Sequence, residues 1–329
     1  MVANISTKNG KAEAVTSMSP AWWDRDGEYC VDHHMTSDEV WGDRGVLNFD
    51  YALRPVFDES GSPIKGYLRT VRTDTGATVG CGLTNRYKLV QPRKAFEWID
   101  SLMNDGVMKY ASAGVLRGGK EIWILGVIPD ADGASINGER HQKHVLWTDR
   151  YDGGGSLKWF PCATRVECSN TLSLALGERD RKLFQGIRHS GDMDTKLEAA
   201  RSAIIDAKQA FQQYNADCRK LIAATYTKGE AKHFVERLFP SLHDAASQRS
   251  KSIRERKVQA VRDAFADETN NLGEMPGTWY QLANAVTFAV DHSNVFAFRG
   301  DDTRFTSLMT GDGAKLKRDA FDLALSMAN

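Results

Sequence analysis

The chain has 329 residues, and 41% of them are hydrophobic, which is enough to build buried cores in about two domains. Lys and Arg together number 43, as do Asp and Glu, so no global positive charge marks a protein that coats nucleic acid. The five cysteines include no C-x-x-C pair and predict neither a disulfide framework nor a zinc site, which fits a reducing cytosol.

The first twenty residues are polar and contain Gly10, Ser17, Ser19 and Pro20, so we expect residues 1–20 to form a flexible tail. They lack the apolar segment of a signal peptide. No other stretch approaches the roughly 18 apolar residues of a membrane-spanning helix. We therefore expect a soluble protein of the cytoplasm that does not contact membranes.

The next predicted elements are a hairpin and a helix. Residues 66–89 are rich in strand formers, with turn residues at 73–76, and predict two paired strands. Pro92 ends the second strand. Apolar residues then recur at helical spacing over 94–103, which predicts an amphipathic helix.

Residues 113–128 give the clearest local pattern, because two apolar strands flank Gly118 and Gly119. A two-residue Gly-Gly loop suits the tight turn of a hairpin, where both residues need positive φ. A second hairpin is predicted from strands at 145–149 and 157–160, joined by the loop 152–156. Residues 162–176 are predicted to pass from strand to helix.

The remaining chain is predicted to be helical. Its first helix, of about 30 residues, has an apolar seam with alternating steps of four and three, which indicates packing along a single partner. The members of this seam are Met193, Leu197, Ala200, Ile204, Ala207, Phe211, Tyr214, Cys218 and Leu221. The small residues favour an intramolecular partner, although a coiled coil between protomers of a homo-oligomer stays open. Further helices are predicted at 230–239, 248–268, 278–292 and 314–327.

These elements predict an α+β fold. Antiparallel hairpins with one or two packed helices occupy residues 21–190, and an all-α domain with one long helix occupies residues 191–329.

Enzyme signatures are missing from the sequence. It contains no phosphate-binding P-loop, no nucleophile elbow and no H-E-x-x-H zinc motif. The paired histidines, His33 with His34 and His141 with His144, lack the neighbours that a metal needs. We therefore expect no cofactor, no metal and no catalytic residue. A hydrolase or nuclease is the third-ranked alternative, because it should show a tight cluster of carboxylates with metal-ligand spacing. The candidates Asp130, Asp132, Asp149 and Asp152 are only loosely grouped in the sequence.

Basic and aromatic residues alternate along the predicted hairpins. Arg86 and Lys88 are expected on one face of a strand, and Arg117 and Lys120 at a hairpin tip. Such a surface could hold phosphates by charge and stack bases on aromatic rings. The predicted interface comprises Arg86, Lys88, Arg117, Lys120, Trp123, Lys158, Arg165 and Arg188. The alternative is that Trp123 and Tyr87 belong to the core and the cations are merely solvated.

Five ordered motifs carry a resemblance to a known family. They lie at 84–92 (TNRYKLVQP), 116–123 (LRGGKEIW), 164–176 (TRVECSNTLSLAL), 187–191 (IRHSG) and 277–292 (GTWYQLANAVTFAVDH). Together they resemble the phage/plasmid-like protein family that carries the domain of unknown function 932, over about residues 22–327. The resemblance implies a protein of a bacteriophage or mobile element in the bacterial host cytosol. It implies no activity.

The arrangement of hairpins and helices also resembles, at the level of fold alone, the core of phage single-strand annealing proteins. We therefore predict a protein that binds single-stranded nucleic acid and could anneal it, without covalent chemistry. The main alternative is a protein-binding or counter-defence module. In that module the long seamed helix and the acidic segment 24–59, with ten acidic and three basic residues, dock on a host protein.

Overall fold

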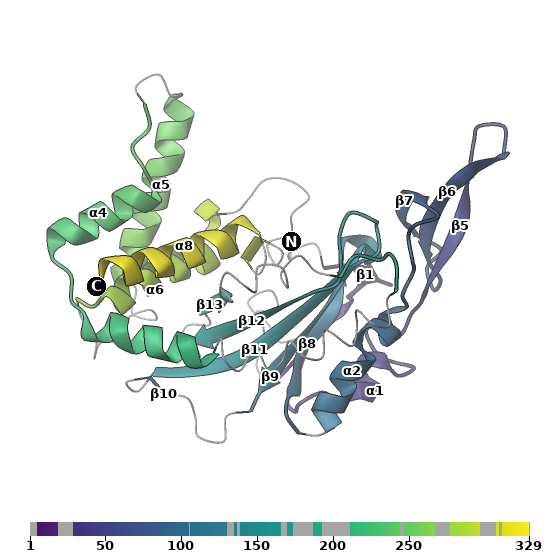
Figure 1. Cartoon of the computed structure of the whole chain (residues 1–329), viewed down its shortest axis with the longest axis horizontal. Coiled ribbons are helices and arrows are strands. Elements are labelled where there is room, and N and C mark those ends of the chain that lie inside the picture. The colour runs from purple at the N-terminus through teal and green to yellow at the C-terminus, as the bar shows by residue number, and fades with distance from the viewer. Residues whose placement is uncertain are drawn as a thin grey trace. The chain divides into compact units, whose positions relative to one another are not determined.

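The computed structural model describes residues 5–18, 29–104, 106–129, 135–136, 139–165, 170–173, 187–192, 211–243, 247–266, 277–296, 307–308 and 311–328. The fold is mixed α+β, as the sequence predicted (Figure 1). It has two compact units, each discontinuous in sequence. Unit 1 comprises Met1–Pro129, His144–Pro161 and Leu176–Lys208, and unit 2 comprises Asp130–Lys143, Cys162–Ala175 and Gln209–Asn329.

Six strands of an eight-stranded sheet lie wholly or partly in unit 1, in the order β12-β11-β9-β8-β3-β4. These strands are β3 (Ala14–Ser17), β4 (Cys30–Val31), β8 (Lys109–Leu116), β9 (Glu121–Ile128), β11 (Glu139–Arg150) and β12 (Lys158–Arg165). β11 and β12 continue into unit 2, where they pair with β10 (Ser135–Ile136) and β13 (Asn170–Ser173). The predicted strands at 145–149 and 157–160 thus belong to this sheet.

The N-terminal segment differs from the prediction. β1 (Thr7–Lys8) and β2 (Lys11–Ala12) form a small hairpin, and β3 pairs with β8 in the central sheet. The prediction of a flexible tail is therefore wrong for residues 5–18. The strand is short and its partner is about a hundred residues away, with Ala14 opposite Gly114, so no local pattern reveals the pairing.

A separate three-stranded sheet, which we call the arm, consists of β5 (Tyr51–Phe57), β6 (Pro63–Arg72) and β7 (Thr78–Thr84). The predicted hairpin of β6 and β7 is confirmed, whereas β5 was not predicted. The β5–β6 hairpin runs on beyond the end of β7 (Figure 1). One face of the arm is buried through Tyr51, Thr70 and Leu83, while the other face is largely exposed.

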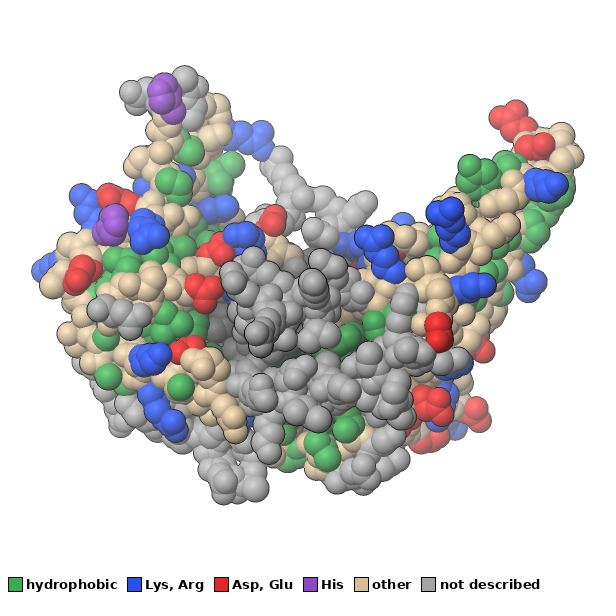
Figure 2. All heavy atoms as spheres, viewed as in Figure 1, with side chains coloured by type: hydrophobic (Ala, Val, Ile, Leu, Met, Phe, Trp, Pro, Cys, Tyr) green, Lys and Arg blue, Asp and Glu red, His purple; other side chains and the backbone are tan. Residues whose placement is uncertain are grey.

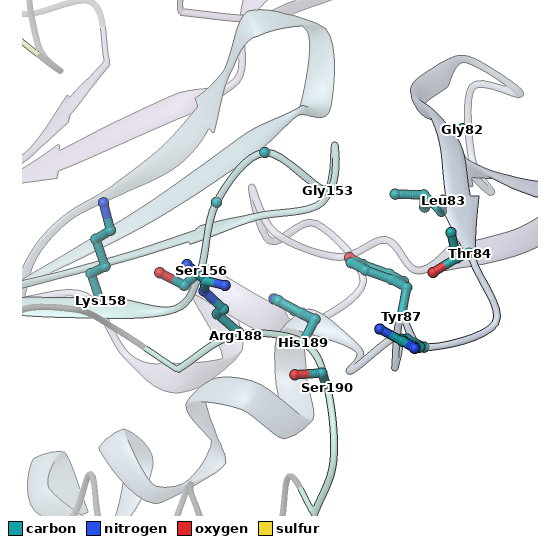
Figure 3. A pocket seen from close by; sticks show the side chains of 13 residues that line it. Gly82, Leu83, Thr84, Tyr87, Gly153, Ser156, Lys158, Arg188, His189 and Ser190 are labelled. Atoms are coloured by element: carbon teal, nitrogen blue, oxygen red, sulfur yellow. The ribbon is translucent and has the colours of Figure 1, made fainter.

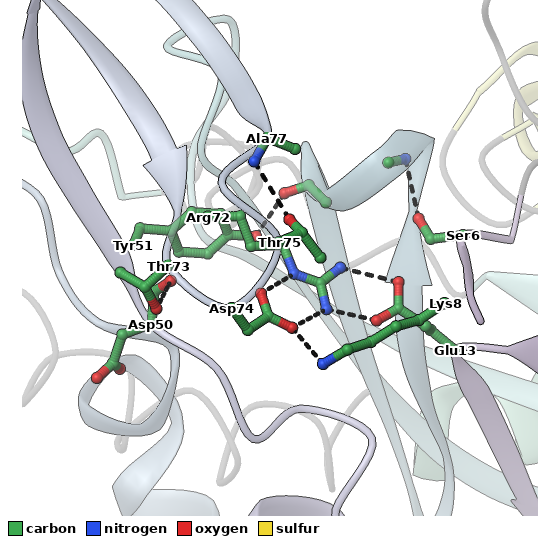
Figure 4. A network of polar contacts seen from close by, with 12 residues as sticks. Ser6, Lys8, Glu13, Asp50, Tyr51, Arg72, Thr73, Asp74, Thr75 and Ala77 are labelled. Carbon is green, nitrogen blue, oxygen red and sulfur yellow. Dashed lines mark hydrogen bonds and ion pairs between the residues drawn. The ribbon is translucent and has the colours of Figure 1, made fainter.

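A buried ion cluster joins the arm to the N-terminal segment (Figure 4). The Arg72 guanidinium donates hydrogen bonds to both oxygens of Glu13 and to Asp74, and its carbon lies 3.7 Å from the centre of the Phe49 ring. Lys8 Nζ lies 2.6 Å from Asp74 Oδ2. Burial acts to raise the pKa of Asp74, but hydrogen bonds from Arg72 and Lys8 prevail and hold it below its usual value.

The helix predicted at 94–103 is confirmed as α2 (Pro92–Asn104), which starts on a proline because the first helical position needs no N–H donor. Its apolar face buries Phe96 and Ile99 completely. α1 (Ser37–Trp41) contacts this helix through Trp41, whose ring centre lies 6.1 Å from that of Phe96. The helix and the sheet share this part of the core.

The hairpin around Gly118 and Gly119 is confirmed as β8 and β9, which pair up to Leu116 opposite Glu121. The loop has four residues rather than two, because Arg117–Gly119 form a short 3-10 turn. Arg117, Gly118 and Gly119 all have positive φ, at 56°, 67° and 95°.

Unit 2 contains the four predicted C-terminal helices: α4 (Lys228–Leu238), α5 (Gln248–Ala266), α6 (Trp279–His292) and α8 (Asp312–Met327). α6 packs against α5, α8 and β13 and is buried along most of its length. Residues 211–223 form the described part of the predicted long helix. The remainder of that helix, and residues 174–186, lie outside the described residues, so the domain boundary near residue 190 stays a prediction.

Four members of the apolar seam are described, and all of them are buried: Phe211, Tyr214, Cys218 and Leu221. The Tyr214 ring stacks on Phe321 of α8, with ring centres 5.7 Å apart. This half of the seam therefore packs within unit 2. Over the part of the chain that the structure describes, no helix is both long and apolar enough to cross a membrane.

Candidate nucleic-acid interface

A pocket of about 710 Å³ lies within unit 1 and is lined by three segments of the chain. The first is the end of β7 and the residues after it, up to Tyr87. The second is the loop between β11 and β12 with Lys158, and the third is the segment 188–190. Figure 3 shows Thr84 and Tyr87 on one side, Ser156 and Lys158 on the other, and His189 between them.

The first segment is positioned by a bulge in β7. Gly82 has a φ of +78°, and the pairing of β6 with β7 shifts register there. β7 ends at Thr84, and the Tyr87 N–H donates to the Thr84 carbonyl to close a turn. The prediction that Arg86 and Lys88 lie on a strand is therefore wrong. The turn leaves the Arg86 side chain exposed at the pocket.

Three consecutive glycines shape the second segment. A side chain on Gly153, whose φ is +80°, would meet Leu83 Cδ2 at 2.3 Å, and one on Gly155 would meet Arg150 Cδ at 2.4 Å. The loop is anchored by Asp152, which accepts a hydrogen bond from the Gly154 N–H at 2.9 Å. Only glycine allows this loop to pass so close to its neighbours.

Backbone hydrogen bonds hold the third segment in place. Ile187 and Leu157 exchange N–H···O=C bonds of 3.0 and 2.7 Å, and the Lys88 N–H donates to the His189 carbonyl at 2.7 Å. These bonds place Arg188 beside Lys158 at the pocket. The Arg188 side chain is exposed.

His189 forms a rigid wall of the pocket. Its Nε2 lies 2.7 Å from the buried Asp149 Oδ1, and its Nδ1 lies 3.2 Å from the Lys88 carbonyl oxygen. The Tyr87 ring stacks on the imidazole, with centres 5.3 Å apart. Because both ring nitrogens are engaged, His189 has no nitrogen left to act as a general base, and the arrangement favours a structural role.

The Tyr87 hydroxyl is a polar group at the pocket that the described residues leave without a hydrogen-bond partner. Figure 3 shows it directed from the β7 side toward the glycine loop. Burial, and then the negative charge of Asp149, raise the pKa of Tyr87, so the group is a neutral hydroxyl at physiological pH.

The charge around the pocket is positive. Arg86, Lys158 and Arg188 line it, and neither Asp nor Glu is among the described residues that do so. Arg86 and Lys158 form no ion pair with any residue in the described ranges. The neighbouring carboxylates are already engaged, since Asp149 binds His189 and Asp152 lies 2.5 Å from Arg150.

The structure thus brings three of the predicted interface residues together at one pocket. Arg117 and Lys120 lie in the β8–β9 loop, at the same end of the sheet as Lys158, and the Lys120 carbonyl accepts a hydrogen bond from Tyr151. Lys88 is exposed beside the pocket without lining it. Arg165 ends β12 in unit 2, and its side chain lies outside the described residues.

Trp123 has no exposed surface, and its Nε1–H donates to Ser112 Oγ at 3.2 Å. Trp159 is also buried. Neither ring has a face to offer a base, so the alternative that placed Trp123 in the core is the correct one for this residue. Tyr87, which lies between Arg86 and Lys88 in the sequence, lines the pocket.

The chemistry of the described residues gives no sign of a metal centre. Within the described ranges, no group of three or more His, Cys, Asp or Glu side chains could hold an ion. His33 is exposed and bonded to Glu39 and Asp32, which raise its pKa in that order. Asp130, Asp132 and the His141 side chain, named in the metal and nuclease alternatives, lie outside the described residues.

Sequence reasoning missed the glycine loop as a wall of the pocket, although the run Asp-Gly-Gly-Gly-Ser at 152–156 was visible. It also missed the bond between Asp149 and His189, which are forty residues apart. A run of glycines between two strands indicates that the loop packs closely against another part of the chain, but the run does not identify that part. The sequence therefore could not show that the loop contacts Leu83 or that Asp149 binds His189.

A family model described as a domain of unknown function (DUF932) matches residues 83–314, more than half of the chain. The match includes Arg86, Lys158 and Arg188. No curated protein and no solved structure matches the chain.

Proposed function

Because the chain belongs to the family of the domain of unknown function 932, whose description assigns no activity, we propose a function from the pocket itself. Unit 1 binds single-stranded nucleic acid without covalent chemistry. The phosphates of the ligand meet Arg86, Lys158 and Arg188 at the pocket. The ligand is held by charge and hydrogen bonds and not by sequence-specific contacts.

One observation carries this proposal: three cationic side chains from distant parts of the sequence line a single pocket that has no described carboxylate in its wall. Clustering like charges costs stability unless an anion offsets the repulsion. A volume of about 710 Å³ lies within the 300–1,000 Å³ of typical ligand sites. A nucleotide with its phosphate therefore fits the size and the charge.

A single strand fits this pocket better than a duplex. Duplex sequence is read by a helix or ribbon that enters a groove, whereas this pocket is a concave site walled by loops. Hydroxyl groups of Thr84, Ser156 and Ser190 line it beside the cations and Tyr87. Such groups bind phosphate oxygens and do not discriminate between bases.

The test is a double substitution, Arg86→Gln with Lys158→Gln, measured by fluorescence anisotropy with a labelled oligothymidylate over a series of salt concentrations. Two lost phosphate contacts should lower the slope of log affinity against log salt by about 1.4, since each contact on a single strand contributes about 0.7. Affinity at low salt should fall roughly tenfold or more.

The matched control is Lys11→Gln with Arg44→Gln, which removes two exposed charges of unit 1 away from the pocket. It should leave the slope nearly unchanged. The proposal fails if the unaltered protein does not bind the oligonucleotide at low salt, or if the control weakens binding as much as the pocket variant. Mixing complementary labelled strands with the protein then tests annealing.

The alternative of docking on a host protein is weakened by the burial of the described half of the apolar seam. Tyr214 and Leu221 already pack within unit 2 and offer no free apolar stripe. Capture of partners from a host lysate with and without nuclease separates the two functions. Partners that survive nuclease would favour the host-protein alternative.

A further inference from the structure

A second cationic surface lies on the exposed face of the arm. Arg54 of β5 and Arg69 of β6 are directly opposite each other in the sheet, so their side chains emerge on the same face. Cys81 of β7 is opposite Arg69 on its other side and is exposed. Tyr67, two residues from Arg69, lies on this face too and is 49% exposed.

A cross-strand pair of arginines is unfavourable by itself. Like charges directly opposite on neighbouring strands destabilise a sheet. No described carboxylate forms an ion pair with Arg54 or Arg69, and Arg69 donates a hydrogen bond to Thr78 Oγ1 at 2.8 Å. Figure 2 shows basic side chains along the arm, with the acidic ones gathered at its outer tip. The repulsion between the two arginines is therefore uncompensated within the described chain.

This face meets the pocket at Thr84, the last residue of β7, whereas Leu83, which also lines the pocket, lies on the opposite face of the arm. Tyr67 is the pairing partner of Thr84, and Thr84 lines the pocket. Arg69 follows Tyr67 by two residues along β6, and Arg54 is the cross-strand neighbour of Arg69 on β5. Two residues along a strand span about 7 Å, so the path is short.

We propose that the strand bound in the pocket continues over Thr84 onto this face of the arm, where Arg54 and Arg69 bind its phosphates and Tyr67 stacks on a base. This inference rests on the proposed function and specifies its ligand as a polynucleotide, not a mononucleotide. Paired arginines neutralise the backbone, and an exposed aromatic ring accepts any base. The like-charged pair is then a binding feature whose repulsion the ligand relieves.

The test uses Arg54→Gln with Arg69→Gln and two probes: a dinucleotide with a terminal phosphate, which reaches the pocket only, and an oligothymidylate of about 20 nucleotides, longer than typical single-strand sites. The variant should lose roughly tenfold in affinity for the long probe and reduce its salt slope by about 1.4. Its affinity for the dinucleotide should stay unchanged. Arg44→Gln is the control for loss of charge elsewhere in unit 1.

A second measurement uses the exposed thiol of Cys81. The long probe should slow alkylation of Cys81, followed on its own peptide by mass spectrometry, and the dinucleotide should not.

A structural role for the two arginines predicts a less stable variant, whereas relief of repulsion predicts one at least as stable as the parent.

The inference about the arm is overturned if the arm variant binds the long probe as tightly as the parent while the pocket variant, Arg86→Gln with Lys158→Gln, does not bind it. The proposed function would still stand in that case. Failure of the parent to bind either probe overturns both. Loss of the long probe alone, with Cys81 protected in the parent, supports the path over the arm.

Discussion

Glu121 shows how the surroundings of one residue control its charge. It starts β9 beside the β8–β9 loop and is only 5% exposed, and the described residues leave its Oε2 without a hydrogen-bond partner. Burial raises its pKa, and the positive charges of Arg150, Arg117 and Lys158 oppose that rise without cancelling it. The carboxyl group is therefore a cost to the folded protein when ionised.

We expect Glu121→Gln to raise the free energy of unfolding at neutral pH by about 1 kcal/mol, the scale of an unsatisfied buried polar group. The raised pKa sets the pH dependence. Below the usual pKa of 4.5, Glu121 is protonated in both the folded and the unfolded protein and does not lower the free energy of unfolding. As the pH rises from 4.5 through the raised pKa, the free energy of unfolding of the unaltered protein falls.

Urea denaturation at several pH values measures this difference. The gap between variant and parent should be small below about pH 4.5 and widen toward neutrality. A variant that is less stable than the parent at pH 7 would show that the neighbouring cations bind the carboxylate strongly enough to outweigh its burial.

At the scale of elements, Arg72 links β6 to the N-terminal segment through Glu13, and Asp74, which also binds Arg72, contacts Lys8 of the same segment. Arg72→Met should destabilise the protein by about 3–5 kcal/mol, because it leaves the buried Glu13 carboxylate without its partner. Arg72→Met combined with Glu13→Leu should be less destabilised than Arg72→Met alone. Chemical denaturation of the two variants and of Glu13→Leu measures the coupling. Additive effects would mean that the ion cluster does not act as a unit.

Elements with local patterns were predictable from the sequence. The β8–β9 hairpin has its glycines between two apolar strands, and α2 has its apolar spacing after Pro92, so both follow from neighbouring residues. β3 and β5 were missed, because a strand of four residues or one interrupted by Pro55 has no clear pattern. These segments are strands because they pair with β8 and β6, and not because of a pattern in their own residues.

The candidate site was predictable in its composition and not in its geometry. Arg86 and Lys158 were singled out as basic residues beside aromatic ones, Arg188 was also included in the predicted interface, and the three meet at one pocket. Trp123 was included in the predicted interface, with a place in the core as the open alternative, because a position in the middle of an apolar strand is typical of a core residue. Alternation along a strand separates the two faces but does not say which face is buried.

At the scale of the whole molecule, a balance of 43 basic and 43 acidic residues conceals local separation of charge. Four carboxylates of unit 1, Glu13, Asp74, Asp149 and Asp152, are engaged in ion pairs within the unit. Among the cations at the pocket and on the arm, Arg86, Arg188 and Arg54 are exposed, and Lys158 and Arg69 are partly exposed. A neutral protein can thus present a positive surface to a polyanion.

The discontinuous units have a consequence for how the chain tolerates cleavage. Unit 2 takes Cys162–Ala175 from the N-terminal part of the sequence, and its helices α6 and α8 pack against β13 within that stretch. A protease site introduced between residues 193 and 210 would yield two fragments, neither of which contains all of unit 2. We expect them to co-elute in size-exclusion chromatography under native conditions and to separate in denaturant; separate native elution would contradict this. The fragments should also complement each other when expressed as two polypeptides, as in a split reporter.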